Sequence, residues 1–378
     1  MKKKVQYILL FLLGGILGFF LGFMVYRSEP KAEETISAQI EATKTDAAKQ
    51  QSSSESTTQE AESESKETIT EMTTETTTQD STIELTEAVD IDEEITSELV
   101  LDDDLCIIEN TSYQIPQDKL QRLQKLKLDS GKSYSFYIKD LNNGAVFSYH
   151  DTSKIFCASS IKFPYAFYVS RYISLNNSQL YEERITYAQR YVPADRGGSG
   201  IIQYEPAGSE FSIGELLDYS IRYSDNVAYS MLVDYFGRNE YGDFVSSFEA
   251  ESLRLGNGAY PYITARDLGK AYEAYYKEFG QDTGVEYLWD SLTHCETGVY
   301  GVYSFDTIEF IRDILSCTVA EKYGCTPNSY NHAGIVMREQ PYVMVILTEN
   351  GLYNTAAQWH RELITLLDEI VIEYQNHF

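Results

Sequence analysis

Ser159-Ser160-Ile161-Lys162, Ser224-Asp225-Asn226 and Lys322-Tyr323-Gly324 are the three short stretches that decide the fold of this chain. Each stretch alone carries little information, since Ser63-Glu64-Ser65-Lys66 repeats the Ser-x-x-Lys pattern inside a strongly polar segment. Ser224-Asp225-Asn226 would also suit a turn or a helix cap, because all three residue types favour those positions. The information lies in their order, their spacing and the elements around them.

The pattern around these stretches predicts strands at both ends of the folded part and helices in the middle. Asn143-Gly144 between two β-like runs is a strong hairpin signal. Ser212 with Glu215, and Thr264 with Asp267, resemble capping boxes at helix starts. We expect strands at 133–139, 145–149, 317–323, 332–337 and 342–348, and helices at 116–127, 160–175, 213–222, 226–236, 265–279 and 355–375. This order predicts one sheet built from both ends of the chain, with an all-α lobe inserted between them.

Ser-x-x-Lys, Ser-Asp-Asn and Lys-Thr-Gly in this order form the signature of class A β-lactamases and penicillin-binding proteins. From about residue 130 to 378 the chain resembles that superfamily, with Tyr323 where the family usually has Thr. The resemblance implies an α/β (α+β) fold of the β-lactamase type: an antiparallel sheet flanked by N- and C-terminal helices, plus the inserted all-α lobe. The three motifs would then meet at the seam between sheet and lobe, where ligand sites are common.

Ser159 and Lys162 are the candidate nucleophile and base. Residues three apart share a helix face, so the amine of Lys162 could reach the hydroxyl of Ser159. A serine hydroxyl needs a neighbouring base, and lysine can serve if burial and nearby positive charge favour its neutral form. Lys322 would supply that charge. The alternative reading is structural: Ser159 as an N-cap and Lys162 as a solvated helix residue.

The resemblance also implies roles for the other motif residues. Ser224 would relay a proton between the lysines and the leaving group, and Asn226 would hold the amide side chain of the substrate, while Asp225 turns inward and fixes the loop. Lys322 would attract the carboxylate that β-lactams and D-alanyl-D-alanine peptides carry. Gly324 would let the substrate approach the strand. The backbone N–H groups of Ser159 and Cys325 would form the oxyanion hole.

Two departures from the family pattern bear on activity. Tyr323 cannot place its hydroxyl where threonine would, so Asn331 or His332 on the next strand is a candidate to compensate. Class A β-lactamases deacylate with a glutamate in a Glu-x-x-Leu-Asn loop, and the corresponding stretch here, 249–254, does not match it. Glu249 and Glu251 are the candidates, although solvated surface charge is the favoured interpretation of both. Without that glutamate an acyl-enzyme would persist, as in a penicillin-binding protein.

Two other functions stay open at this point. The first is a hydrolase-like module that has lost turnover and binds a wall peptide or a protein partner, which Tyr323 and the missing glutamate favour. The second is a Cys-His hydrolase built from Cys325 and His332, for which no third residue orients the pair. The preferred hypothesis is a serine hydrolase acting on β-lactams or peptidoglycan stem peptides.

The N-terminus predicts a membrane anchor. Met1-Lys2-Lys3-Lys4 precedes an apolar run over 5–26 that is long enough to span a bilayer as a helix. A cleaved signal peptide would want a small-residue cleavage site, which Val25-Tyr26-Arg27 lacks. We expect residues 1–27 to form a cytoplasmic basic cluster and a single transmembrane helix, with the remainder extracytoplasmic.

The composition of residues 28–104 predicts a disordered tether between the anchor and the folded domain. They hold 23 Asp and Glu against four Lys, a net charge of −19, and no Trp, Tyr, Phe or Cys. Such a segment cannot bury enough apolar surface to offset its conformational entropy. Residues 105–378 would form the hydrolase domain.

Composition also excludes several classes of partner. The net charge of −28 argues against nucleic acid, which requires clustered basic residues. Five scattered histidines show no metal-ligand spacing, so we expect neither a metal nor another cofactor. Five cysteines are too few for a disulfide framework, although one or two bridges remain possible.

Overall fold

The computed structural model describes residues 102, 104–191, 199–281, 283–297, 308–351 and 354–377. By its contacts the chain divides between Asp92 and Glu93, and every described residue belongs to the second unit. The predicted anchor (5–26) and most of the predicted linker lie outside the described residues. Within the described part, no helix is both long and apolar enough to span a bilayer.

A six-stranded antiparallel sheet forms the centre of the described part. In spatial order its strands are β1 (Ile107–Glu109), β3 (Val146–Tyr149), β2 (Tyr134–Asp140), β10 (Tyr342–Thr348), β9 (Ser329–Val336) and β8 (Val319–Thr326). Residues from the two ends of the chain pair in the middle, where β2 and β10 run antiparallel from Tyr134↔Thr348 to Asp140↔Tyr342. The predicted sheet built from both chain ends is confirmed, and β8 lies at one of its edges, with β1 at the other.

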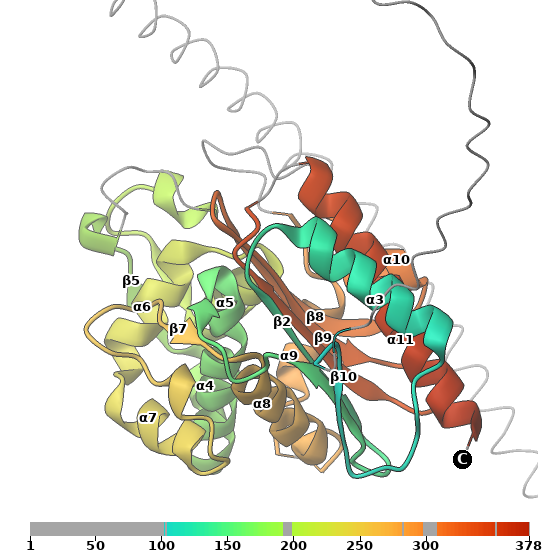
Figure 1. Cartoon of the computed structure of the whole chain (residues 1–378). Helices are drawn as coiled ribbons and strands as arrows, with labels where there is room; N and C mark the ends of the chain where they lie inside the picture. The colour runs from blue at the N-terminus through green and yellow to red at the C-terminus, as the bar shows by residue number, and fades with distance from the viewer. Residues whose placement is uncertain are drawn as a thin grey trace, which may run out of the picture. The chain divides into compact units, whose positions relative to one another are not determined.

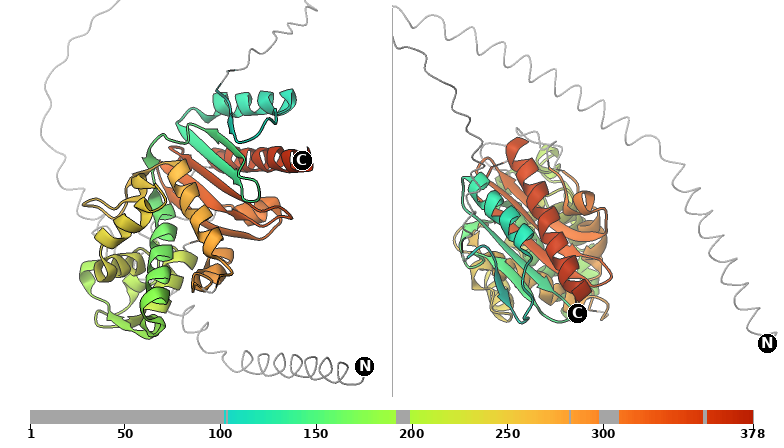
Figure 2. Two further views of the ribbon diagram at one scale, coloured as in Figure 1. Left: turned by 90° about the horizontal axis from the view of Figure 1, so that it is seen from below. Right: turned by 45° about the vertical axis from the view of Figure 1, so that its right-hand side comes forward.

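The N- and C-terminal helices cover one face of this sheet (Figures 1 and 2). They are α3 (Gln117–Ser130) and α11 (Asn354–His377), which are joined by a hydrogen bond from Trp359 Nε1 to the carbonyl of Leu126 (2.9 Å). Successive side chains along a strand point to opposite faces of the sheet. Phe136 and Ile138 of β2 pack under these helices, whereas Tyr137 between them faces the opposite layer.

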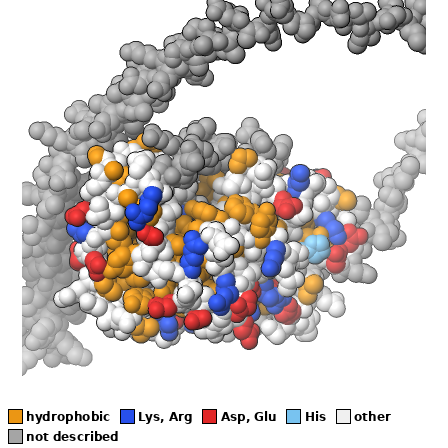
Figure 3. Space-filling model, turned by 90° about the vertical axis from the view of Figure 1, so that its left-hand side faces the viewer, with side chains coloured by type: hydrophobic (Ala, Val, Ile, Leu, Met, Phe, Trp, Pro, Cys, Tyr) orange, Lys and Arg blue, Asp and Glu red, His pale blue; other side chains and the backbone are white. Residues whose placement is uncertain are grey.

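An inserted lobe, mostly helical, packs on the other face and extends beyond it. Its elements are β4 (Ile155–Phe156), the 3₁₀ helix η1 (Ala158–Ile161), α4 (Lys162–Asn176), η2 (Ser178–Glu182), β5 (Arg184–Thr186), η3 (Gln189–Tyr191), η4 (Ile202–Tyr204), β6 (Glu210–Ser212), α5 (Ile213–Arg222), α6 (Asn226–Phe236), α7 (Asn239–Ser246), η5 (Glu251–Leu253), β7 (Tyr262–Ile263), α8 (Ala265–Glu278) and α9 (Tyr287–Thr293). The short helix α10 (Ile311–Leu315) packs instead against α11, and its buried residues belong to the core cluster under α3 and α11. The long helix α4 is buried along most of its length, which places it at the centre of the larger core cluster. Seen from the side of the lobe, apolar side chains reach the surface between Lys, Arg, Asp and Glu (Figure 3).

Of the two predicted capping boxes, one forms completely and the other forms only in part. At α5 the capping box is complete, because Ser212 and Glu215 each accept from the other's backbone N–H. At α8 Thr264 accepts from the N–H of Asp267, but the Asp267 carboxylate accepts instead from the N–H of Ser252 (2.9 Å). The second predicted box is therefore only half formed.

The β8–β9 hairpin is longer than the sequence predicts. The expected strand ended at Tyr323, whereas β8 continues to Thr326 and turns into β9 at Ser329. The whole third motif thus lies inside the edge strand. Its residues reach the lobe from a rigid, hydrogen-bonded element rather than from a loop.

Candidate active site

Ser159 lies in a tight turn at the entrance to α4. After β4, the 3₁₀ helix spans Ala158–Ile161 and α4 begins directly at Lys162. Ala158 has φ 44°, in the left-handed region that residues with a side chain rarely adopt. Backbone strain of this kind concentrates at functional sites, where the surrounding structure holds it in place. Ser159 itself is half-buried between the buried residues Ala158 and Ser160.

Strand β8 packs directly on this turn through Gly324. A Cβ atom at position 324 would lie 2.7 Å from the carbonyl oxygen of Cys157 and 2.8 Å from the backbone nitrogen of Ser159. Backbone atoms cannot move aside as a flexible side chain can, so any side chain here would push the strand away from the turn. From the sequence we expected a glycine at position 324 because it would let the substrate approach the strand closely. In the structure the backbone of Cys157 and Ser159 is what approaches it.

The side chain of Lys162 reaches the second motif. Its Nζ donates to the carbonyl oxygen of Ser224 (2.5 Å) and to Oδ1 of Asn226 (2.6 Å), and lies 3.4 Å from the Ser224 hydroxyl. The side chain is fully buried. Among the described residues, the amino group of Lys162 contacts polar atoms of the second motif. The expected hydrogen bond from Lys162 to the hydroxyl of Ser159 is not among these contacts.

Ser224 stands between two lysines. Lys322 Nζ donates to the Ser224 hydroxyl (3.0 Å) and to the carbonyl oxygen of Tyr323 (2.9 Å). Ser224 has φ 53°, a second strained position, and is completely buried. This conformation aims its carbonyl at Lys162 while its hydroxyl lies within reach of both amino groups.

Burial changes the acidity of both amines. It lowers the pKa of Lys162 well below the ordinary lysine value, and repulsion from the Lys322 ammonium lowers it further. Burial also lowers the pKa of Lys322. A buried amine near a second positive charge favours its neutral form, which can accept a proton. The site therefore has the electrostatics that a lysine base requires.

Asp225 fixes the loop that carries the second motif. Its Oδ1 accepts from the N–H groups of Val227 and Ala228 at the start of α6, and its Oδ2 accepts from those of Ile201 and Ile202. Burial raises the pKa of this carboxyl group, and the four N–H donors, which match the lone pairs of the carboxylate, oppose that rise. The inward turn that the resemblance implied for Asp225 is what the structure shows.

A second segment braces the same loop from outside. Ser199 Oγ donates to the carbonyl of Ser224 (2.6 Å), and the backbone N–H of Asn226 donates to the carbonyl of Ser199 (3.0 Å). Gly200, at φ 119°, lies so close to Asp225 that a Cβ would fall 2.2 Å from its Cγ. Ser199 and Gly200 thus border the site.

Tyr260 is a neighbour of the site that the sequence did not reveal. Its hydroxyl donates to Oδ1 of Asn226 (3.1 Å), the same oxygen that accepts from Lys162. Burial raises the pKa of this phenol, so it remains a donor. Tyr260 lies in an irregular segment with no motif around it, and no spacing in the sequence could have identified it.

Tyr323 and Asn331 take structural positions. Tyr323 is buried edge-on against Phe310, with ring centroids 5.5 Å apart, and the Lys322 amino group lies 4.0 Å from its ring centre. Asn331 donates to the carbonyls of Phe156 (2.9 Å) and Cys157 (3.0 Å), and its Oδ1 accepts from the N–H of Thr348. Its amide is fully used in holding the segment that precedes Ser159, so it is not free to bind a substrate carboxylate.

His332 does not compensate for the missing threonine either. It is buried, and neither of its ring nitrogens has a hydrogen-bond partner among the residues that the structure describes. Its ring instead lies 4.6 Å from that of Tyr330 and 5.1 Å from that of His360 on α11, centre to centre. A cysteine–histidine pair with Cys325 is thus absent from the described contacts, and all five cysteines are free.

The two glutamates considered for deacylation lie on the surface. The side chain of Glu249 is 89 % exposed and 3.5 Å from Lys270, and that of Glu251 is 64 % exposed and 3.7 Å from Arg254. Both have the solvated environment that the sequence favoured.

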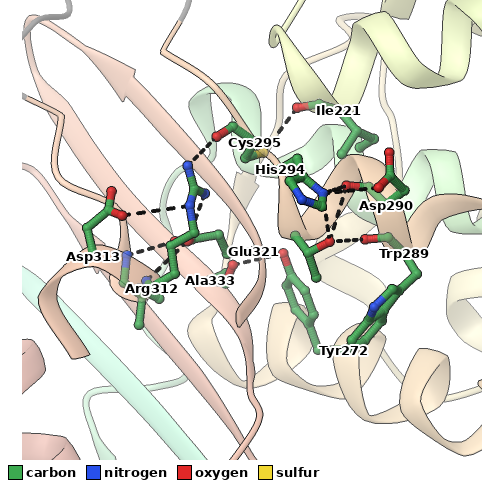
Figure 4. Close-up of polar contacts among 12 residues, drawn as sticks. Ile221, Tyr272, Trp289, Asp290, His294, Cys295, Arg312, Asp313, Glu321 and Ala333 are labelled. Carbon is green, nitrogen blue, oxygen red and sulfur yellow. Dashed lines mark hydrogen bonds and ion pairs between the residues drawn. The ribbon is translucent and has the colours of Figure 1, made fainter. Parts of the chain in front are cut away.

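A buried ion pair supports the strand that carries Lys322. Glu321 accepts from the backbone N–H groups of Ile311 and Arg312 and from the Arg312 guanidinium, which also donates to the carbonyl of Cys295 (Figure 4). The thiol of Cys295 in turn contacts the carbonyl of Ile221, near the end of the helix that leads to Ser224. Burial raises the pKa of Glu321 to about 7. This chain of contacts ties the edge strand to the lobe.

The arrangement has the parts of an acyl-transfer site. A serine hydroxyl sits on a strained turn, a second hydroxyl lies within reach of two buried amines, and an edge strand carrying Cys325 packs on the turn through Gly324. The backbone N–H groups of Ser159 and Cys325 remain the predicted oxyanion donors. No group of His, Cys, Asp and Glu in the described ranges is arranged to hold a metal ion.

Residues 116–371 match the profile of the β-lactamase enzyme family. No curated protein matches the chain. Among solved structures, PBP-A is similar at 19 % identity and a TM-score of 0.53, with 68 % of this chain and 100 % of PBP-A covered. A mutant of PBP-A in an acyl-enzyme complex with penicillin G is similar at 20 % identity and a TM-score of 0.53, covering 66 % and 96 %. A β-lactamase from Sphaerobacter thermophilus is similar at 18 % identity and a TM-score of 0.56, covering 68 % and 97 %. At these identities the structural similarity shows a shared fold.

Proposed function

The chain belongs to the β-lactamase enzyme family and is a serine hydrolase of the β-lactamase or penicillin-binding type, and from this premise we propose that Ser159 forms an acyl-enzyme with β-lactams or with cell-wall peptides ending in D-alanyl-D-alanine. The position of the Ser224 hydroxyl is the observation that supports the proposal most directly. It lies 3.0 Å from the amino group of Lys322 and 3.4 Å from that of Lys162. A hydroxyl in that position can move a proton between the two amines and a leaving group.

We propose that Lys162, Ser224 and Lys322 each act in the acylation of Ser159. Lys162, as a neutral amine, takes the proton of the Ser159 hydroxyl while its Oγ attacks the substrate carbonyl carbon. The bond from that carbon to the leaving nitrogen then breaks, and the proton reaches the nitrogen through Ser224. The backbone N–H groups of Ser159 and Cys325 stabilise the oxyanion. Lys322 attracts the substrate carboxylate, and Asn226 holds its amide.

We further propose that the acyl-enzyme persists. Glu249 and Glu251 are exposed surface charges, so neither is placed to activate a deacylating water. A slow second step suits a penicillin-binding role better than efficient lactam hydrolysis. PBP-A, which has the same fold, has been solved as a mutant in an acyl-enzyme complex with penicillin G.

We also propose that the domain works outside the cell, tethered by residues 28–104 to a single helix at 5–26. The basic residues at 2–4 and the apolar run that follows support this arrangement. Fractionation of cells tests it: the full-length chain should sediment with membranes and be accessible to external protease. Deletion of residues 1–27 should release it, and a chain that stays soluble at full length would contradict the anchor.

Intact-mass measurement after exposure to benzylpenicillin tests the acyl-enzyme. We expect a mass increase equal to one penicillin, retained after free penicillin is removed, and none in Ser159→Ala. Ser160→Ala, which removes a neighbouring hydroxyl that bonds the carbonyl of Cys157 (2.7 Å), is the matched control and should still be labelled. An unchanged mass for the wild-type chain would refute the proposal.

The same experiment separates a second candidate function. A wall-peptide-binding module without turnover is favoured by one observation, the buried tyrosine at position 323 in place of the family's threonine. It would bind stem peptides equally well in Ser159→Ala and show no mass increase with penicillin.

A further inference from the structure

A hollow of about 520 Å³ opens beside the strand that carries the third motif. Its walls include Phe156 and Tyr262 of the small β4–β7 sheet, Thr326 at the end of β8, and two charged residues, Lys132 and Glu349. Volumes of this size are typical of sites for small ligands. None of these residues has a role in the acylation described above.

The hollow begins where the nucleophile's segment and the edge strand end. Phe156 lies three residues before Ser159, and Thr326 directly follows Cys325. The two segments are held together, since Gly324 packs on the backbone around Ser159 and the Asn331 amide bonds the carbonyl of Phe156. A ligand that extends along β8 past Cys325 therefore enters the hollow.

Its walls combine an apolar surface with two exposed charged side chains, those of Lys132 and Glu349. The rings of Phe156 and Tyr262 meet edge-on, with centroids 5.6 Å apart, and Tyr262 is 58 % exposed. A backbone hydrogen bond from the N–H of Glu349 to the carbonyl of Ser133 (2.9 Å) holds Glu349 next to the residue that follows Lys132, just beyond the paired ends of β10 and β2. Within the described residues, neither Lys132 nor Glu349 forms an ion pair, with the other or with a third residue.

The order of the proposed binding groups along β8 sets the direction in which a peptide substrate lies on this strand. Lys322 would attract the terminal carboxylate, and the N–H of Cys325 would bind the oxyanion, so the peptide runs from its C-terminus at Lys322 toward its earlier residues at Thr326. The residue before D-alanyl-D-alanine then lies next to the hollow. This step rests on the proposed function.

We propose that the hollow is a subsite for the side chain of that residue, and that it selects a diamino acid whose side chain ends in both an ammonium and a carboxylate group. The methylene groups of the side chain lie on the rings of Phe156 and Tyr262. The ammonium pairs with Glu349 and the carboxylate pairs with Lys132. A side chain with one charge leaves the opposite residue unpaired, and an apolar side chain leaves both.

Competition with a fluorescent penicillin tests this on the full-length chain. Three peptides share the D-alanyl-D-alanine end and carry diaminopimelate, lysine or norleucine before it, giving two charges, one charge or none. We expect the diaminopimelate peptide to slow labelling of Ser159 at concentrations at least tenfold lower than the norleucine peptide, with the lysine peptide between them. Glu349→Gln and Lys132→Met should each reduce that advantage several-fold and leave penicillin labelling without peptide unchanged.

The controls separate failure of the subsite from failure of the proposed function. Glu339→Gln, at an exposed glutamate on the β9–β10 hairpin, should keep the full preference. Normal labelling with equal potency of the three peptides, or a preference unchanged in both variants, would overturn the subsite alone. No labelling of the wild-type chain would overturn the proposed function and the subsite with it.

Discussion

The amino group of Lys322 lies 3.0 Å from the hydroxyl of Ser224, across the seam between the edge strand and the helical lobe. The two residues are 98 positions apart, and both are completely buried. A polar contact at such depth is retained only when its partners are well placed, because an unpaired buried group is costly. Through this contact and the one with Lys162, the Ser224 hydroxyl links the two amino groups on the proton path that we propose toward the leaving group.

Ser224→Ala should slow acylation by about 10²–10⁴-fold, the range that a positioned proton-transfer group contributes. The substitution removes the hydroxyl and keeps the backbone carbonyl, so Lys162 retains its contacts with that carbonyl and with Asn226. The rate of labelling by a fluorescent penicillin measures the effect. Ser230→Ala removes another hydroxyl of the lobe, which bonds the carbonyl of Asn226, and should label normally. Equal rates for both variants would exclude the relay.

The pH dependence of acylation should report the state of Lys162. Because burial and Lys322 lower its pKa well below that of an ordinary lysine, the amine gains its neutral form at a correspondingly lower pH. The labelling rate should rise with pH through this inflection and then level off. In Lys322→Met the repulsion is removed, so the pKa of Lys162 rises and the inflection moves to higher pH.

The matched control for this shift is Lys125→Met, which removes an exposed amine that pairs with Asp129 on α3. Its profile should overlay that of the wild-type chain. An inflection at the same pH in Lys322→Met would show that the two amines do not interact.

Local signals in the sequence were enough to predict much of the fold. The Asn143-Gly144 turn joins β2 and β3, with Gly144 at φ 80°, and the Ser212 capping box forms in full. These features depend on residues a few positions apart. Thr264 and Asp267 show the limit, since a distant N–H, that of Ser252, takes the carboxylate that the box required.

The site's supporting residues could not be predicted, because their partners are far away in the chain. Asn331 bonds the carbonyl of Cys157, 174 positions earlier, and Tyr260 bonds Asn226, 34 positions earlier. Neither belongs to a motif. The motif residues were identified by order and spacing, whereas their geometry depends on contacts that only the folded chain shows.

Gly324→Ala should destabilise the protein by about 1–3 kcal/mol and slow acylation, because the added methyl meets the backbone of Cys157 and Ser159 at less than 3 Å. Strand and turn would have to separate, which also displaces the predicted oxyanion donors. Thermal denaturation and penicillin labelling measure the two effects. Gly256→Ala is the control, since a methyl there meets no atom within 4 Å. A fully stable and active Gly324→Ala would show that the contact between β8 and the turn can relax.

The buried imidazole of His332 should make the protein sensitive to mild acid. Burial lowers its pKa to about 3 in the folded state, against about 6.5 for an unperturbed histidine. Its contribution to stability is therefore complete above pH 6.5 and is lost as the pH falls, because the unfolded state binds a proton that the native state excludes. Between pH 6.5 and 5 the loss from this residue should be about 2 kcal/mol.

His332→Phe keeps the ring and removes the titrating nitrogens, so the free energy of unfolding, measured with urea at both pH values, should fall less steeply with acid than in the wild-type chain. The carboxylates contribute to both proteins and cancel in the comparison. His294→Gln removes a histidine that is 63 % exposed beside Asp290 and should leave the slope nearly unchanged. If His332→Phe kept the wild-type slope, the imidazole would have to be hydrated or charged in the native state, contrary to its burial beside His360.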